Sequence, residues 1–222
     1  MRIAICGGTG DIGAGLALRL ANDTDHEILI GSRDPKRARS KAEEYETELS
    51  SRGRDRTIKG FANEMVADRG DLVVVAVPPY HVGDTIETIA DKLDDETILV
   101  SPAVGIKRDE NGARYHRPPQ GSVTELAAEA TPENVPVVGA FHNLPAGRLA
   151  NLDAELDMHV ILVGDDTDAV DIVRSVTQGI DGLEPLYAGP LVNAAEVESL
   201  TPLAINLAIY NDGLHDLGVK FL

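Results

Sequence analysis

Short apolar segments alternate along the chain with longer segments in which apolar positions recur at helical spacing. The clearest is LVVVAV at Leu72–Val77, which has no polar face and is stopped by Pro78 and Pro79. Such a run is typical of a parallel strand that helices cover on both faces. The same criteria predict strands at Arg2–Cys6, His26–Ile30, Thr57–Gly60, Thr97–Val100 and Val135–Ala140, and helices at Ala14–Ala21, Pro35–Leu49, Asn63–Asp68, Val82–Leu93 and Ser122–Ala130.

The alternation of predicted strands and helices is interrupted before residue 150 and resumes after it. The polar, turn-rich stretch 105–121 is expected to be a long loop. The alternation predicts an α/β fold with a doubly wound parallel sheet, in which residues 1–150 form the main domain and 151–222 a smaller C-terminal α/β unit. The expected elements of that unit are strands at His159–Gly164 and Leu183–Ala188, a helix at Asp168–Gln178 and a last apolar helix from Val192 to Tyr210.

Composition and charge narrow the classes of partner. Hydrophobic residues make up 43% of the 222 residues but aromatic ones only 4%, which suits a core of small aliphatic side chains. The formal net charge is −17, so nucleic acid and anionic membranes are not expected as partners. Cys6 is the only cysteine, no signal peptide or apolar span is evident, and a cytoplasmic location is expected.

The basic residues are mostly arginines, against an acidic excess of 37 to 20. Acid-rich, lysine-poor surfaces suit a high-salt cytosol, because screening removes their self-repulsion. We therefore expect a halophilic protein, with an acidic protein of an ordinary cell as the alternative.

A glycine-rich loop follows the first strand directly. Gly8, Gly10 and Gly13 fit the spacing G-x-G-x-x-G between a strand and a helix, the phosphate loop of Rossmann-type dinucleotide-binding domains. The helix N-terminus beyond it offers free N–H groups to a pyrophosphate. The residues expected to contact the cofactor here are Gly8, Thr9, Gly10, Asp11 and Ile12. Asp11 is unfavourable beside a phosphate unless it points away or caps the helix.

The end of the second strand selects the cofactor. NAD-binding domains place an acidic residue there for the ribose 2′-hydroxyl, but this chain has Gly31, Ser32 and Arg33. The Arg33 guanidinium and the Ser32 hydroxyl can bind a 2′-phosphate, and Arg37 adds positive charge. The sequence therefore predicts NADP(H) rather than NAD, against the alternative of a merely solvated helix start.

Several longer segments resemble the F420-dependent NADP reductases of archaea and actinobacteria. They are GGTGDIGAGLALRLA, the GSR strand end, the VSP turn, FHNLPAGRLANLD, DGLEPLYAGPL, VESLTPLAINL and LGVKFL. The resemblance implies an oxidoreductase that exchanges hydride reversibly between NADP(H) and the deazaflavin coenzyme F420. It also implies that the deazaflavin lies over the nicotinamide in a cleft closed by the C-terminal unit. Because both reactants carry hydride, no catalytic residue and no metal is expected.

Ligands of open α/β sheets bind beyond the carboxyl ends of the strands, which supplies further candidates. Those expected to contact the two cofactors are Val77, Pro78, His81, Ala103, His142 and Leu144. His142 could bond the nicotinamide carboxamide or a deazaflavin carbonyl, or be a loop histidine satisfied by backbone groups. His81 could instead be a helix-start residue without a ligand. Leu144 would pack on a ring face.

Three questions remain open at the level of sequence. Arg114, Arg117 and Arg148 are candidates for the anionic deazaflavin tail. Leu203, Leu207 and Tyr210 share a helical face that could serve domain packing, the deazaflavin pocket or a homodimer interface. The alternatives to the main hypothesis are an NADP-dependent reductase of a small carbonyl or imine and a non-catalytic NADP-sensing module.

Overall fold

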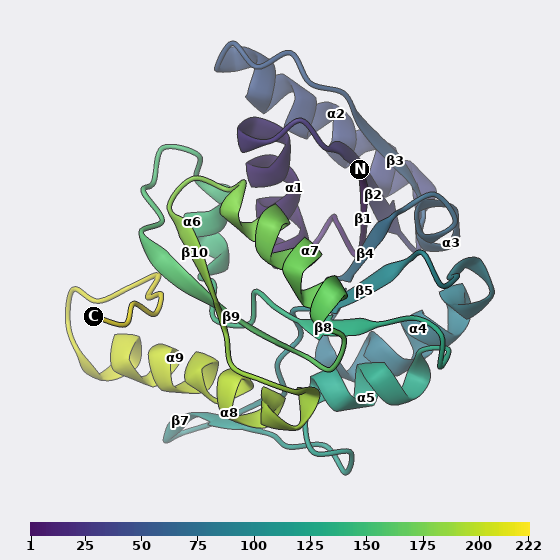
Figure 1. The fold of residues 1–222 in the computed structure, drawn as a ribbon. Coiled ribbons are helices and arrows are strands. Elements are labelled where there is room, and N and C mark those ends of the chain that lie inside the picture. The colour runs from purple at the N-terminus through teal and green to yellow at the C-terminus, as the bar shows by residue number, and fades with distance from the viewer.

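The computed structural model describes residues 1–222, and its framework is an eight-stranded sheet with helices on both faces (Figure 1). The strand order is β10-β9-β8-β5-β4-β1-β2-β3. The strands of the sheet are β1 (Arg2–Cys6), β2 (Glu27–Ser32), β3 (Ile58–Ala62), β4 (Leu72–Val75), β5 (Ile98–Ser101), β8 (Val137–Gly139), β9 (Met158–Gly164) and β10 (Leu183–Tyr187). The helices are α1 (Asp11–Asp23), α2 (Pro35–Ser51), α3 (Asn63–Ala67), α4 (Val82–Ile89), α5 (Val123–Ala130), α6 (Ala146–Ala150), α7 (Thr167–Gln178), α8 (Ala194–Glu198) and α9 (Leu200–Tyr210).

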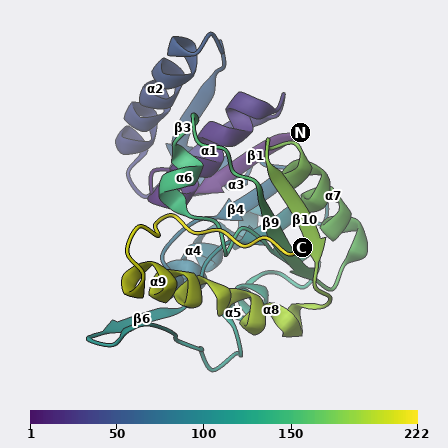
Figure 2. The same ribbon diagram turned by 90° about the vertical axis from the view of Figure 1, so that its left-hand side faces the viewer.

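The C-terminal segment adds its strands to the same sheet. β9 runs antiparallel to β8, with Gly139 opposite Val163, and β10 then pairs parallel to β9. The sheet is therefore parallel except at this one pair. The last residues return along β9, where the His159 N–H donates to the Val219 carbonyl (2.8 Å; Figure 2). The division into domains at residue 150 stays a prediction, and in space the two segments share one sheet.

Two sequence-based expectations are wrong in detail. The stretch expected as a loop contains the hairpin β6 (Ile106–Asp109) and β7 (Gly112–Tyr115). Its strands are polar and short, and Asn206 of α9 holds β7 by bonding both the N–H and the carbonyl of Ala113 (each 2.7 Å). The expected last helix is divided into α8 and α9, because Pro202 has no N–H to donate to the Glu198 carbonyl.

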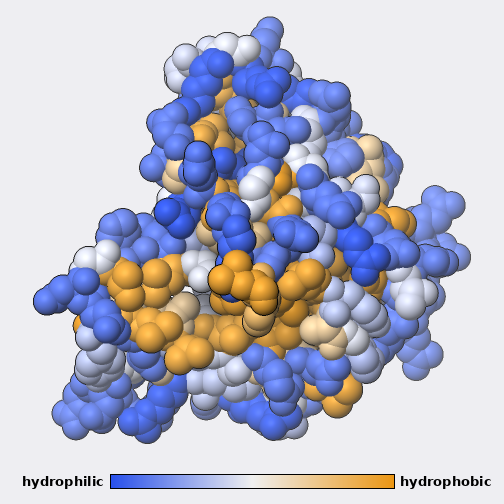
Figure 3. All heavy atoms as spheres, turned by 60° about the vertical axis from the view of Figure 1, so that its left-hand side comes forward, coloured by the Kyte–Doolittle hydropathy of each residue, from blue (hydrophilic) through white to orange (hydrophobic).

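Helix α9 carries an exposed apolar surface. Leu203, Leu207, Ile209 and Tyr210 are between 45% and 65% exposed. Orange surface gathers over the lower part of the molecule in Figure 3, the level at which α9 lies, whereas the upper part around α2 is mostly blue. No helix of the structure has both the length and the apolar character that crossing a bilayer requires.

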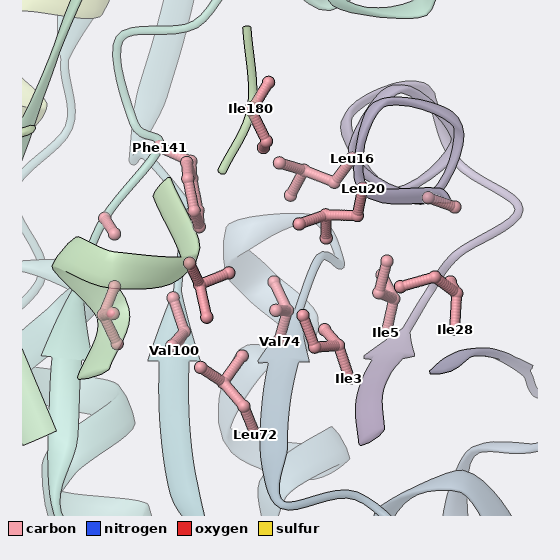
Figure 4. Packing of buried hydrophobic residues seen from close by; sticks show 14 of the residues in the cluster. Ile3, Ile5, Leu16, Leu20, Ile28, Leu72, Val74, Val100, Phe141 and Ile180 are labelled. Carbon is pink, nitrogen blue, oxygen red and sulfur yellow. The ribbon is translucent and has the colours of Figure 1, made fainter. Parts of the chain in front are cut away.

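The strands alternate their side chains between two hydrophobic clusters, one on each face of the sheet. Ile3 and Ile5 of β1 pack with residues of α1, α2 and α7, including Leu16 (Figure 4). Ala4 and Cys6 point to the other face, against α3, α4 and α5. Burial raises the pKa of the Cys6 thiol to about 12, so it is an inert core residue. The small side chains expected from composition fill both clusters.

The chain order creates one switch point in this sheet. From β1 it continues outward to β2 and β3, then returns to β4 and continues outward on the other side. Loops on either side of β1 therefore diverge at the carboxyl end of the sheet and leave a cleft. This is where open α/β sheets bind ligands.

Candidate active site

A cleft of about 580 Å³ opens at the switch point. Its walls come from the segments that follow β1, β2, β3 and β4, together with the first turns of α4. Eight of the residues predicted from sequence line it: Thr9, Gly10, Ser32, Arg33, Arg37, Val77, Pro78 and His81. The fold therefore brings these distant segments together at the carboxyl ends of the strands, where they were expected from the sequence.

The glycines of the phosphate loop are needed for different structural reasons. A Cβ on Gly13 would lie 2.5 Å from the Gly7 carbonyl oxygen, and one on Gly8 would lie 2.7 Å from Ile30 Cβ. These two glycines allow α1 to pack closely on the sheet. A Cβ on Gly10 would meet nothing closer than 3.4 Å, so the protein alone does not require glycine there. A ligand that approaches the loop backbone does require it.

The N-terminus of α1 is open to an anion. Its N-cap is Gly10, which has no side chain to bond the first N–H groups, and these groups carry the positive end of the helix dipole. Asp11 is the first helical residue, is exposed and makes no capping bond. Gly8, Asp11 and Ile12 do not line the cleft. Because Asp11 makes no capping bond, the alternative that it caps the helix is wrong.

The 2′-phosphate residues lie together at the end of β2. Ser32 is 9% exposed, and its Oγ accepts from the Asp34 N–H (3.2 Å). Arg37 reaches back to the loop, where its Nη2 donates to the Thr9 carbonyl (3.4 Å). Asp34 caps α2 through the Lys36 N–H (2.9 Å), so the only acid of this segment is bound to a helix N-terminus. The cluster of Arg33 and Arg37 therefore fits a phosphate.

Residues that were not predicted from sequence also hold the phosphate loop and line the cleft. Asn63 lines the cleft, and its Oδ1 accepts from the Gly7 N–H (3.4 Å). Tyr45 of α2 donates its hydroxyl to the Gly8 carbonyl (3.0 Å). Asn63 follows β3 directly, so the strand-end rule could have found it, whereas Tyr45 had no signal. Glu64 and Asp84 add two carboxylates to the cleft.

Ala103, His142 and Leu144 do not line this cleft. They are buried, with 6%, 3% and 5% exposure, at the carboxyl ends of β5 and β8. The His142 carbonyl accepts from the Thr201 hydroxyl (2.6 Å), and its ring Nε2 lies 3.0 Å from Thr124 Oγ1. The ring is thus bonded to a side chain and not to the backbone. Burial lowers the pKa of His142 to about 3, so the ring is neutral at ordinary pH.

Unsatisfied polar atoms gather around His142. The only buried side-chain N or O atoms without a partner are Ser101 Oγ, His142 Nδ1 and Asn143 Oδ1. Ser101 is the last residue of β5, and His142 and Asn143 follow β8, so all three lie at the same edge of the sheet as the cleft. Phe141, just before His142, has a φ of 66°, a left-handed conformation that non-glycine residues rarely adopt. Unpaired buried polar groups and backbone strain are both typical of ligand sites.

The fold and the cleft define a Rossmann-type dinucleotide-binding protein, and comparison with known proteins gives the family. Residues 2–105 match the family model "NADP oxidoreductase coenzyme F420-dependent". The chain is 35% identical to the F420-dependent NADP reductase of Methanocaldococcus jannaschii, covering 94% of this chain and 93% of that protein. It is 36% identical to that of Methanothermobacter thermautotrophicus, covering 95% and 90%. The chain belongs to the F420-dependent NADP reductases, and the family predicted from its motifs is confirmed.

A solved structure agrees with this fold over the whole chain. A crystal structure assigned as an F420-dependent NADP reductase from Arthrobacter superposes with a TM-score of 0.80. It covers 100% of this chain and 99% of that one, at 24% sequence identity. The Rossmann-type fold class predicted from sequence is therefore confirmed.

Proposed function

We propose that this protein transfers a hydride reversibly between NADP(H), bound in the cleft at the switch point, and coenzyme F420, bound beside it. The observation that supports NADP binding is the end of β2, where Ser32, Arg33 and Arg37 line the cleft and Ser32 and Arg33 stand in place of an acidic residue. A carboxylate there would repel a 2′-phosphate, whereas this cluster binds it.

The protein's own residues would bind and orient NADP along the cleft. The N–H groups at the start of α1 would bind the pyrophosphate, and Gly10 would let it approach the backbone. Val77, Pro78 and His81 line the cleft after β4, farther along the sheet edge toward β5. The nicotinamide and the deazaflavin supply the hydride chemistry when bound, and the protein holds the two rings in contact and excludes water.

The buried group around His142 supports the place of the deazaflavin. Ser101, His142 and Asn143 offer polar atoms without a partner, and Ala103 and Leu144 offer apolar contact. Apolar contacts on a flat ring and hydrogen bonds to its polar edge would together hold the deazaflavin in place. Of the arginines expected to bind the anionic tail, Arg114 pairs with Asp109 (3.3 Å) and Arg117 bonds the Gly121 carbonyl (2.6 Å), while Arg148 on α6 is exposed.

We also propose that the exposed face of α9 pairs two copies of the chain. Leu203, Leu207 and Tyr210 would bury their side chains across a two-fold axis. Measuring the mass in solution for the wild type and Leu207→Glu would test this, since a charge in an apolar interface should give monomers. A wild-type monomer would contradict it.

Isotope transfer tests the reaction itself. NADPH that carries deuterium at both C4 positions is mixed with oxidised F420 and the protein in ordinary water, and the reduced F420 is analysed by mass spectrometry. Direct transfer predicts one deuterium per reduced F420. Reduced F420 without deuterium, or no reduction, would contradict the proposed function.

A further inference from the structure

Glu198, the last residue of α8, is a carboxylate with no solvent exposure that accepts four hydrogen bonds from three residues. Its Oε2 accepts from the Val123 N–H (3.1 Å) and the Tyr115 hydroxyl (2.9 Å). Its Oε1 accepts from both the N–H and the hydroxyl of Thr124 (each 2.9 Å). Burial raises the pKa of Glu198, and these four bonds act against that rise. Glu198 does not line the cleft, and although it lies in the segment VESLTPLAINL, the family resemblance assigns it no role.

The partners of Glu198 determine the direction of the bonds. A backbone N–H can only donate, and one N–H points at each carboxylate oxygen, so both oxygens act as acceptors. The Thr124 hydroxyl has one proton, and it lies 2.9 Å from Oε1 and 3.0 Å from His142 Nε2. The Val123 and Thr124 N–H groups and the Tyr115 hydroxyl favour the ionised form of Glu198, which has no proton to donate. If the Thr124 proton pointed at His142, lone pairs of Thr124 Oγ1 and Glu198 Oε1 would face each other in a buried site. The proton therefore goes to Glu198, and Thr124 Oγ1 accepts from His142.

We propose that Glu198, acting through Thr124, holds His142 in the tautomer protonated at Nε2, so that its unpartnered Nδ1 is a hydrogen-bond acceptor for a cofactor N–H. Glu198 is in this account a positioning residue, and the ligand half rests on the proposed function. His142 then accepts from a ring or amide N–H, such as that of the deazaflavin pyrimidine or the nicotinamide carboxamide. Donation to a deazaflavin carbonyl, one of the roles expected from sequence, is excluded in this tautomer.

The tautomer can be read in the ligand-free protein by NMR of ¹⁵N-labelled histidine, with His142→Gln assigning the signal. The wild type should show one form, with the proton on Nε2, and Thr124→Ser, which keeps the hydroxyl, should match it. Glu198→Gln and Thr124→Val should each give a mixture that includes the Nδ1–H form; if Glu198→Gln fails to fold, Thr124→Val carries the test. A wild type protonated at Nδ1, or both variants retaining only the Nε2–H form, would overturn the proposal.

Steady-state kinetics test the second part of the proposal, that His142 Nδ1 accepts a hydrogen bond from a cofactor. Thr124→Val should raise the KM of the cofactor whose N–H bonds Nδ1 by about tenfold and leave the other KM unchanged, with Thr124→Ser restoring it. A rise for F420 assigns the deazaflavin, and a rise for NADPH assigns the carboxamide. If Thr124→Val changes the tautomer but leaves both KM values unchanged, His142 Nδ1 does not bind a cofactor and this part of the proposal is overturned. A wild type that does not reduce F420 contradicts the proposed function but leaves the NMR result standing.

Discussion

The two halves of the site are built in opposite ways. The NADP cleft is open, is cationic at one end, and takes its key residues from two short segments, 7–13 and 31–37. The region around His142 is buried, and it joins Tyr115, Thr124, Glu198 and Thr201 from separate parts of the chain. A substitution in the first should alter one contact, whereas one in the second should alter a connected network.

The largest effect is expected where the two halves are joined. Arg19 of α1 is 4% exposed and donates to the carbonyls of Leu149, Asn151 and Ala154 (3.0, 2.6 and 2.7 Å), in the segment after His142. Arg19→Met removes these charge-assisted bonds and should lower the free energy of unfolding by about 4 kcal/mol in urea titration. Arg174→Met, at an exposed ion pair, is the control and should change it by less than about 1 kcal/mol.

The next effect is confined to the cleft. Arg33→Glu puts a negative charge where the 2′-phosphate binds, and should lower kcat/KM for NADPH by about 100-fold while raising the relative use of NADH. Arg39→Glu makes the same charge change on α2 at a position that does not line the cleft, and should leave the preference for NADPH intact. Equal losses in the two variants would mean that general charge, and not contact, governs the cofactor.

Substitutions of two glycines in the phosphate loop should affect different properties, stability at Gly13 and cofactor binding at Gly10. Gly13→Ala places a Cβ against the Gly7 carbonyl and should lower the free energy of unfolding by about 2 kcal/mol. Gly10→Ala has room in the protein and should change it by less than about 0.5 kcal/mol, while raising the KM for NADPH. Gly10→Ala with an unchanged KM would show that the pyrophosphate does not approach this loop.

The smallest effect is a pH dependence from the buried half. Because the pKa of His142 is lowered to about 3, the unfolded state binds a proton below its own pKa of about 6.5 and the folded state does not. Stability must therefore fall as pH drops. Between pH 7 and 5.5 the wild type should lose about 1 kcal/mol more unfolding free energy than His142→Gln. Parallel slopes for the two proteins would mean that the ring is not buried in solution.

The sequence predicted the sheet and the NADP cleft because each depends on local patterns. Apolar runs gave the strands, glycine spacing gave the loop, and Ser32 and Arg33 gave the cofactor. The antiparallel β8–β9 pair, the hairpin of 106–115 and the division of the last helix depend on partners distant in the chain, such as Asn206. Glu198 lies in the segment VESLTPLAINL, but the sequence did not reveal its partners, since each hydrogen bond to Glu198 spans 74 residues or more.

The stability of this acidic protein is expected to depend on salt. The charge of −17 predicts that molar salt stabilises the fold by screening repulsion, which thermal unfolding in low and molar KCl would show as a higher Tm. A lower Tm in molar salt would contradict the expectation of a halophilic protein.

The most direct test of the central claim follows the visible absorbance of oxidised F420 when the protein is mixed with NADPH or, separately, with NADH. Hydride exchange between NADPH and F420 should give rapid bleaching with NADPH and little with NADH, and Arg33→Glu should lose that difference. NADPH that binds without bleaching F420 in low or molar KCl would contradict the proposed function, because the cleft would then serve a different second reactant.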